Sequence, residues 1–112
     1  MRLLYTAILA LIICSCYKPG KIEVVNNIDR VEIRDVKWGE IRVASSLFPG
    51  EKSKKLEIDK STDRLPSTYN VSFVMSANGR SIFLTTEATY DLDQDETLTI
   101  ILDDDTPVKS NN

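Results

Sequence analysis

YNVSFVMSANGRSIFLTT, residues 69–86, is the stretch that says most about how this chain folds. The dipeptide Asn78-Gly79 favours a type I′ turn, because both central residues of that turn need positive φ. With these two residues as the loop, Phe73 faces Leu84 across the two strands. The stretch therefore predicts a β-hairpin whose main apolar face carries Val71, Phe73, Met75, Ile82 and Leu84.

Short runs of alternating apolar and polar residues continue on both sides of this hairpin. They repeat with a period of two, which is typical of strands, and none has a helical period. A slip in the alternation near Arg34-Asp35 predicts a β-bulge, and Asn26-Asn27 and Pro49-Gly50 are expected to end strands or turn the chain. About seven or eight short strands predict an all-β, Ig-like antiparallel β-sandwich. The expected runs are residues 22–26, 31–36, 41–45, 53–59, 69–76, 80–86, 88–92 and 98–102.

The N-terminus has a different composition from the rest of the chain. Arg2 precedes the apolar run LLYTAILALII at residues 3–13, which is shorter than the roughly 18 residues of a membrane-spanning helix. A charged start and a short apolar stretch are typical of a secretory signal. A buried helix would show a polar face, and this run has none.

The signal ends in Ile13-Cys14-Ser15-Cys16, which resembles the lipobox of bacterial lipoproteins. The resemblance implies cleavage between Ser15 and Cys16 and attachment of a diacylglycerol to Cys16 through a thioether. Both cysteines of the chain lie in this motif, so we expect a mature domain without a disulfide. The predicted organisation is a signal over 1–15, a lipidated tether over 16–21, a sandwich over 22–106 and a flexible tail over 107–112.

The mature region resembles the small Ig-like envelope lipoproteins of Bacteroidetes-type bacteria. Besides the lipobox, the features that carry the resemblance are Val25-Asn26-Asn27, the segment 47–51 followed by Ser53, and the closing stretch from Tyr90-Asp91-Leu92 through Asp103 to Thr106. It implies a lipid-anchored protein of the outer membrane. In that family an acidic run soon after the cysteine accompanies surface display. Here Lys18 follows Cys16 and the first acidic residue is Glu23, which favours the periplasmic face.

Charge is distributed unevenly along the chain, whose formal net charge is −3. Residues 18–64 hold eleven basic and nine acidic side chains, whereas residues 65–112 hold two basic and eight acidic ones. Such a chain is a poor nucleic-acid binder, because that affinity comes from clustered Lys and Arg. The one basic cluster, Lys52, Lys54 and Lys55, suits either an edge strand that blocks pairing or contact with anionic headgroups.

The composition argues against common catalytic chemistry. The chain has no histidine, which excludes Ser-His-Asp and Cys-His catalysis. Its four glycines are scattered singly, so no phosphate-binding loop is present. We expect no enzyme activity and no cofactor.

Two clusters could nevertheless bind a ligand. Asp91, Asp93 and Asp95 have the spacing of the start of a calcium loop, but Glu96 and Leu102 stand where an EF-hand needs Gly and Glu. A solvated acidic turn explains the same pattern. Trp38, Tyr69 and Tyr90 could stack on sugar rings if they were exposed together, although such residues more often lie in a core.

The sequence thus favours a non-catalytic structural or protein-interaction module, held to the membrane by lipid and facing an envelope protein partner. The alternative is a ligand-binding module for glycans or divalent cations, with the ligand itself unidentified. Lipid attachment is the chemistry that the residues specify most closely.

Replacing Cys16 tests the anchor directly. We expect cells grown with labelled palmitate to label the parent chain and Cys14→Ser, whereas Cys16→Ala remains unlabelled because it lacks the acceptor thiol. Equal labelling of Cys16→Ala and the parent would contradict the assignment.

Overall fold

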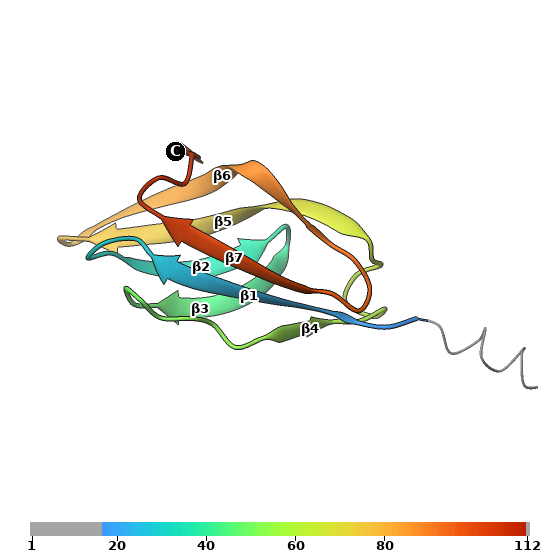
Figure 1. Cartoon of the computed structure of the whole chain (residues 1–112). Coiled ribbons are helices and arrows are strands. Elements are labelled where there is room, and N and C mark those ends of the chain that lie inside the picture. Colours follow the sequence, from blue (N-terminus) through green and yellow to red (C-terminus); the bar gives the residue numbers. More distant parts are fainter. Residues whose placement is uncertain (1–16, 112) are drawn as a thin grey trace, which may run out of the picture.

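The computed structural model describes residues 17–111, which form eight strands arranged as two facing sheets (Figure 1). The strands are β1 (Gly20–Asn27), β2 (Glu32–Trp38), β3 (Ile41–Leu47), β4 (Leu56–Ile58), β5 (Ser67–Ala77), β6 (Arg80–Leu92), β7 (Thr97–Asp103) and β8 (Val108–Ser110). Between residues 17 and 111 no helix is long and apolar enough to span a membrane.

The smaller sheet has the strand order β4-β1-β7, and the larger has the order β3-β2-β5-β6-β8. The predicted all-β sandwich is therefore confirmed. Every strand pair is antiparallel except β1 with β7, which run parallel over seven residue pairs from Lys21↔Thr97 to Asn27↔Asp103. This pair joins the first strand to the last long strand. The smaller sheet is therefore complete only when residues from both ends of the domain lie side by side.

The hairpin of β5 and β6 has the predicted turn and register. Asn78 and Gly79 have φ values of 53° and 75°, and Phe73 pairs with Leu84. β6 is longer than expected, because residues 80–92 form one continuous strand instead of two.

A register shift between Asn70 and Ser72 lets β5 stay paired along this length. Buried Thr86 satisfies the irregular backbone there: its hydroxyl accepts from the Val71 amide at 3.0 Å and donates to the Ala88 carbonyl at 2.9 Å. A hydroxyl that bonds on both sides removes the cost of burying unpaired backbone groups.

The bulge predicted near Arg34-Asp35 is also present. Asp35 has a φ of 55°, and the register of β2 against β5 shifts between Arg34 and Lys37. The extra residue returns Val36 and Trp38 to the inner face, where both are fully buried. Outside, the Asp35 carboxylate pairs with the Arg42 guanidinium at 2.7 Å.

Both predicted ends of the domain need correction. Residues 107–112 were expected to form a flexible tail, but Val108–Ser110 is strand β8 and pairs with residues 84–86 of β6. At the other end, β1 begins at Gly20, inside the predicted tether. β8 forms because the edge of β6 accepts it, and β1 begins early because Gly20 and Lys21 pair with Ile58 and Glu57 of β4. The local sequence does not reveal either partner.

The core lies between the two sheets and has Trp38 at one end. The Trp38 ring meets the Tyr69 ring edge to face, with ring centroids 4.9 Å apart, and its Nε1 donates to the Tyr90 carbonyl at 3.0 Å. Gly39 lies beneath Tyr69 with a φ of 62°, and a Cβ atom there would come within 2.7 Å of the ring. The buried apolar side chains are Ile22, Val24, Ile33, Val36, Trp38, Leu47, Ile58, Leu65, Val71, Phe73, Leu84, Leu92, Ile100 and Leu102.

Asn26 is the fully buried polar residue that joins the two sheets. Its side-chain amide donates to the Val31 carbonyl at 2.8 Å and to the Leu47 carbonyl at 2.9 Å, and its Oδ1 accepts from the Ile28 amide at 3.0 Å. As predicted from Asn26-Asn27, β1 ends here, at Asn27. The Asn26 side chain of the smaller sheet is thus hydrogen-bonded to the larger sheet at two points, just before β2 and at the end of β3.

Removing this amide should destabilise the domain. We expect Asn26→Ala to lower the free energy of unfolding by about 2–4 kcal/mol, because several buried backbone groups lose their partner. Equilibrium unfolding in urea measures the change. The exposed neighbour Asn27 is the control, and Asn27→Ala should stay within about 0.5 kcal/mol of the parent. Equal effects of the two substitutions would contradict this role of Asn26.

Candidate functional site

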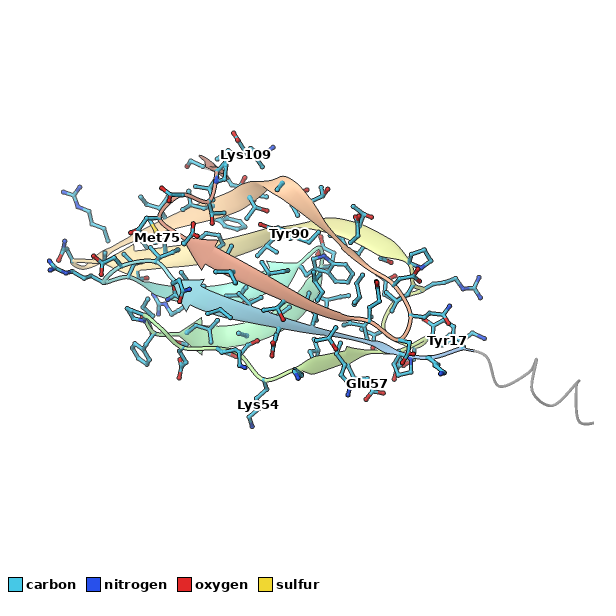
Figure 2. The ribbon with its side chains drawn as sticks, in the orientation of Figure 1. Tyr17, Lys54, Glu57, Met75, Tyr90 and Lys109 are labelled. Atoms are coloured by element: carbon cyan, nitrogen blue, oxygen red, sulfur yellow. The ribbon has the colours of Figure 1, made fainter. Side chains whose placement is uncertain are left out.

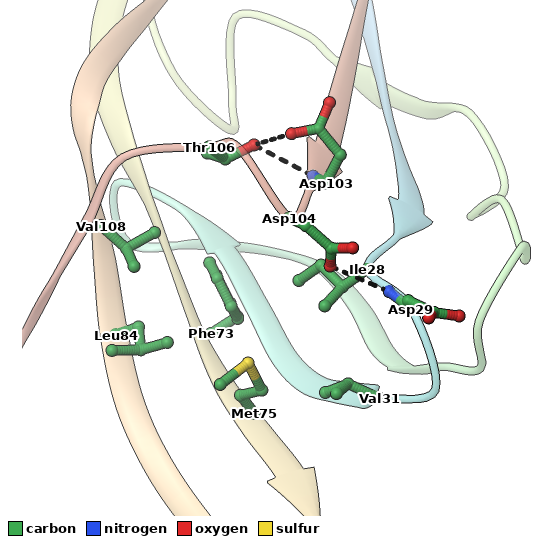
Figure 3. Close-up of a pocket in the computed structure, with 10 residues that line it drawn as sticks. All are labelled: Ile28, Asp29, Val31, Phe73, Met75, Leu84, Asp103, Asp104, Thr106 and Val108. Carbon is green, nitrogen blue, oxygen red and sulfur yellow. Dashed lines mark hydrogen bonds between the residues drawn. The ribbon is translucent and has the colours of Figure 1, made fainter.

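An apolar pocket of about 280 Å³ opens between the sheets where β1 and β7 end (Figure 3). The β5–β6 hairpin extends past this point, so part of its inner face has no strand opposite it. Phe73 and Leu84 form the buried floor, and half-buried Met75 lies beside them. We call this cavity the distal pocket; its lining residues are Ile28, Asp29, Val31, Phe73, Met75, Leu84, Asp103, Asp104, Thr106 and Val108.

The apolar surface continues from the pocket to the tip of the hairpin. Ile82 pairs with Met75, so the two side chains share the face that carries the pocket floor. The Ile82 side chain is 40% exposed. Contiguous apolar surface on a monomer is typical of a binding site when polar residues surround it.

Exposed carboxylates form the rim of the distal pocket. Asp104 accepts from the Asp29 amide at 3.1 Å, and Asp103 accepts from the Thr106 hydroxyl at 3.1 Å (Figure 3). These bonds hold the two loops that flank the pocket. Within residues 17–111, the ion pairs join Lys18 to Asp95, Arg34 to Glu32 and Arg42 to Asp35, so the rim carboxylates form no ion pair there.

The distal pocket and the N-terminal end of the domain lie at opposite ends of the sandwich. Figure 2 shows Tyr17 at one end and Met75 towards the other. β1 runs between them, and at about 3.3 Å per residue its two ends are roughly 23 Å apart.

The segment just before β1 is held against the domain. The Tyr17 hydroxyl donates to the Asp63 carbonyl and accepts from the Leu65 amide, both at 3.3 Å. The Lys18 amide donates to Gln94, and the Lys18 ammonium lies 3.7 Å from Asp95. The chain therefore has little slack between residue 17 and the sandwich.

The acidic triplet proposed as a calcium site does not converge. Asp91 accepts from the Thr68 hydroxyl at 2.7 Å, Asp93 accepts from the amide of Gln94, and Asp95 pairs with Lys18. No group of three potential metal ligands occurs among the described residues. The triplet forms the β6–β7 turn and holds the segment that precedes β1.

The three aromatic residues weighed for sugar stacking do not form an exposed platform. Trp38 is fully buried, and Tyr69 and Tyr90 are half-buried beside it. They belong to the core at the N-terminal end of the domain.

The basic cluster lies exposed next to the edge of the smaller sheet. Lys52 forms an isolated bridge with Val25, and Lys54 and Lys55 precede the edge strand β4. Figure 2 shows Lys54 along the side of the sandwich, away from the end that carries Tyr17. This position agrees with the predicted protection of an edge strand.

The predicted cleavage and lipid-attachment residues, Ser15 and Cys16, lie outside the described residues. Comparison with known proteins finds no matching family model, no similar curated protein and no similar solved structure. The candidate site therefore rests on the geometry of the chain itself.

Sequence reasoning found the floor of the distal pocket but not its walls. The hairpin face at Phe73, Met75 and Leu84 follows from alternation, whereas Ile28 and Val108 come from segments that were expected to be a loop and a tail. The run Asp103-Asp104-Asp105 was the one signal for the acidic rim, and the sequence did not show that a cavity lay beside it.

Tyr69 titrates unusually in this fold. Its hydroxyl donates to Asp63 Oδ2 at 2.9 Å. That hydrogen bond, then partial desolvation and the Asp63 charge, raise the pKa of Tyr69. The pKa of Tyr69 is higher in the folded state than in the unfolded state, where it is about 10. The protonated Tyr69 hydroxyl therefore stabilises the fold fully below pH 10, and this stabilisation is lost as pH rises through the folded pKa.

We therefore expect Tyr69→Phe to be less stable than the parent at pH 7 and to approach the parent above pH 10. Melting temperatures between pH 7 and pH 11 measure this convergence. Asp63→Asn keeps an acceptor without the charge, so spectrophotometric titration should give Tyr69 a lower pKa in that variant. A constant difference between Tyr69→Phe and the parent at every pH would contradict the assignment.

Proposed function

We propose that this protein is a non-catalytic interaction module of the bacterial cell envelope, anchored by a lipid on Cys16 at the periplasmic face of the outer membrane. The observation that carries the interaction function is the distal pocket, an apolar cavity with an uncompensated acidic rim. A pocket of this kind suits a partner that presents an apolar side chain with basic residues next to it.

The bonding of Tyr17 to the domain supports the same function. An anchor on Cys16 would place the membrane directly beside Tyr17, which is bonded to the domain. The distal pocket, at the far end of β1, would then face away from the lipid surface and towards other envelope components.

The distribution of polar groups supports a binding role over catalysis. The carboxylates on the rim are exposed, and those of Asp103 and Asp104 are occupied in holding the loops. General acid–base chemistry usually needs a carboxylate whose pKa is shifted by burial or by a close charged neighbour. The floor offers only apolar side chains, which bind by excluding water.

Photocrosslinking in the intact envelope tests the proposal. With benzoylphenylalanine at position 82, beside the pocket, we expect irradiation to give a discrete protein adduct of the full-length lipoprotein. Placing the same group at exposed Thr89, on the same strand but away from the pocket, should give at least tenfold less of that adduct.

Two results would overturn the interaction function. One is the absence of adducts from position 82 in correctly processed protein. The other is an equal pattern of adducts from positions 82 and 89, which would indicate random collisions.

A further inference from the structure

We infer that the occupant of the distal pocket is a second copy of this chain, which inserts Phe48 from the turn after β3. This inference rests on the proposed interaction function of the pocket and names the partner. It follows from the exposure of Phe48, from the opposite charges around Phe48 and the pocket, and from the position of both features at the same end of the sandwich.

Phe48 is the most exposed large apolar side chain among the described residues, at 60%. It stands at the start of a turn that the chain holds rigidly: the Glu51 amide donates to the Phe48 carbonyl at 2.9 Å, and Gly50 has a φ of 83°. The Phe48 amide donates to the Glu51 carboxylate at 3.0 Å, which turns that acidic group back towards its own chain. A rigid turn with one protruding ring loses little conformational freedom on binding.

The charges around the two features are complementary. Lys52 and Lys54 follow the Phe48 turn and are exposed, and neither forms an ion pair within residues 17–111. Asp29 and Asp104 flank the pocket and form no ion pair within residues 17–111. The exposed lysines near Phe48 are therefore available to the acidic rim of a second copy.

Phe48 and the pocket are separate features of the larger sheet. Phe48 follows β3, whereas the pocket is lined by Val31, which precedes β2, and by Phe73 and Leu84 of β5 and β6. Because Phe48 and the pocket are different patches of the surface, Phe48 of one copy can enter the pocket of another.

Both features lie at the same end of the sandwich. The Gly50 amide donates to the Asn26 carbonyl, which places the Phe48 turn beside the end of β1, where the distal pocket also opens. Copies anchored in one membrane would hold Phe48 and the pocket at equal height. Lateral contact would then need no tilting of the domain.

Photocrosslinking from Phe48 tests this partner. With benzoylphenylalanine at position 48 of the full-length lipoprotein in its membrane, we expect covalent dimers whose crosslinked peptides contain Met75, Val31 or Phe73 of the second copy. The same group at Phe83, which is 45% exposed on the outer face, should give no such dimers and serves as the matched control.

Charge reversal tests the complementarity. We expect Asp104→Lys on the rim to lower the dimer yield about three- to tenfold. Glu40→Lys, an exposed site beside Tyr69 at the other end of the domain, should leave the yield unchanged. Phe48→Ala without a crosslinker should weaken self-association about tenfold or more in analytical ultracentrifugation of the detergent-solubilised chain.

The outcomes separate this inference from the function on which it rests. Adducts from position 82 that contain a different envelope protein, with no dimers from position 48, would overturn the second copy as occupant and leave the interaction function standing. Dimers whose crosslinks lie outside the pocket would also overturn it. Absence of adducts from both positions would overturn both proposals.

Discussion

The buried amide of Asn26 is the interaction on which the sandwich most depends. Two facing sheets hold together mainly through non-directional apolar contacts, which leave their relative position loosely defined. Asn26 adds directed bonds from β1 to the Val31 and Leu47 carbonyls, and its own backbone bonds the turn that carries Phe48. Asn26 therefore fixes one end of the core. It also positions the distal pocket and the Phe48 turn, which we propose enters the distal pocket of another copy.

The domain has two chemically different ends. The end near Tyr17 is closed by Trp38, Tyr69 and the β6–β7 turn, and its polar groups bond one another. The opposite end stays open because the hairpin extends past the smaller sheet, leaving apolar side chains beside exposed carboxylates. An anchor beside the closed end would direct the open end outward, which is the arrangement an interaction module needs.

Local chemistry made much of the fold predictable. The Asn78-Gly79 turn, the register at Phe73 and Leu84 and the bulge at Asp35 all follow from backbone preferences and side-chain alternation within a few residues. The prediction failed where a strand depends on a distant partner. β8 exists because the edge of β6 accepts it, and the continuous β6 exists because Thr86 satisfies the irregular backbone beside it.

By itself, the sequence determined the all-β class, the central hairpin and the absence of a histidine-based centre, since composition and short-range alternation settle these features. It also contains the lipobox-like motif on which the proposed anchor rests. Only the tertiary structure decided the parallel pairing of β1 with β7, the dispersal of Asp91, Asp93 and Asp95 among separate partners, and the distal pocket. Each of these features depends on which distant segments of the chain lie side by side in the fold. Alternation along one strand cannot reveal this, because it carries no information about where the opposite sheet ends.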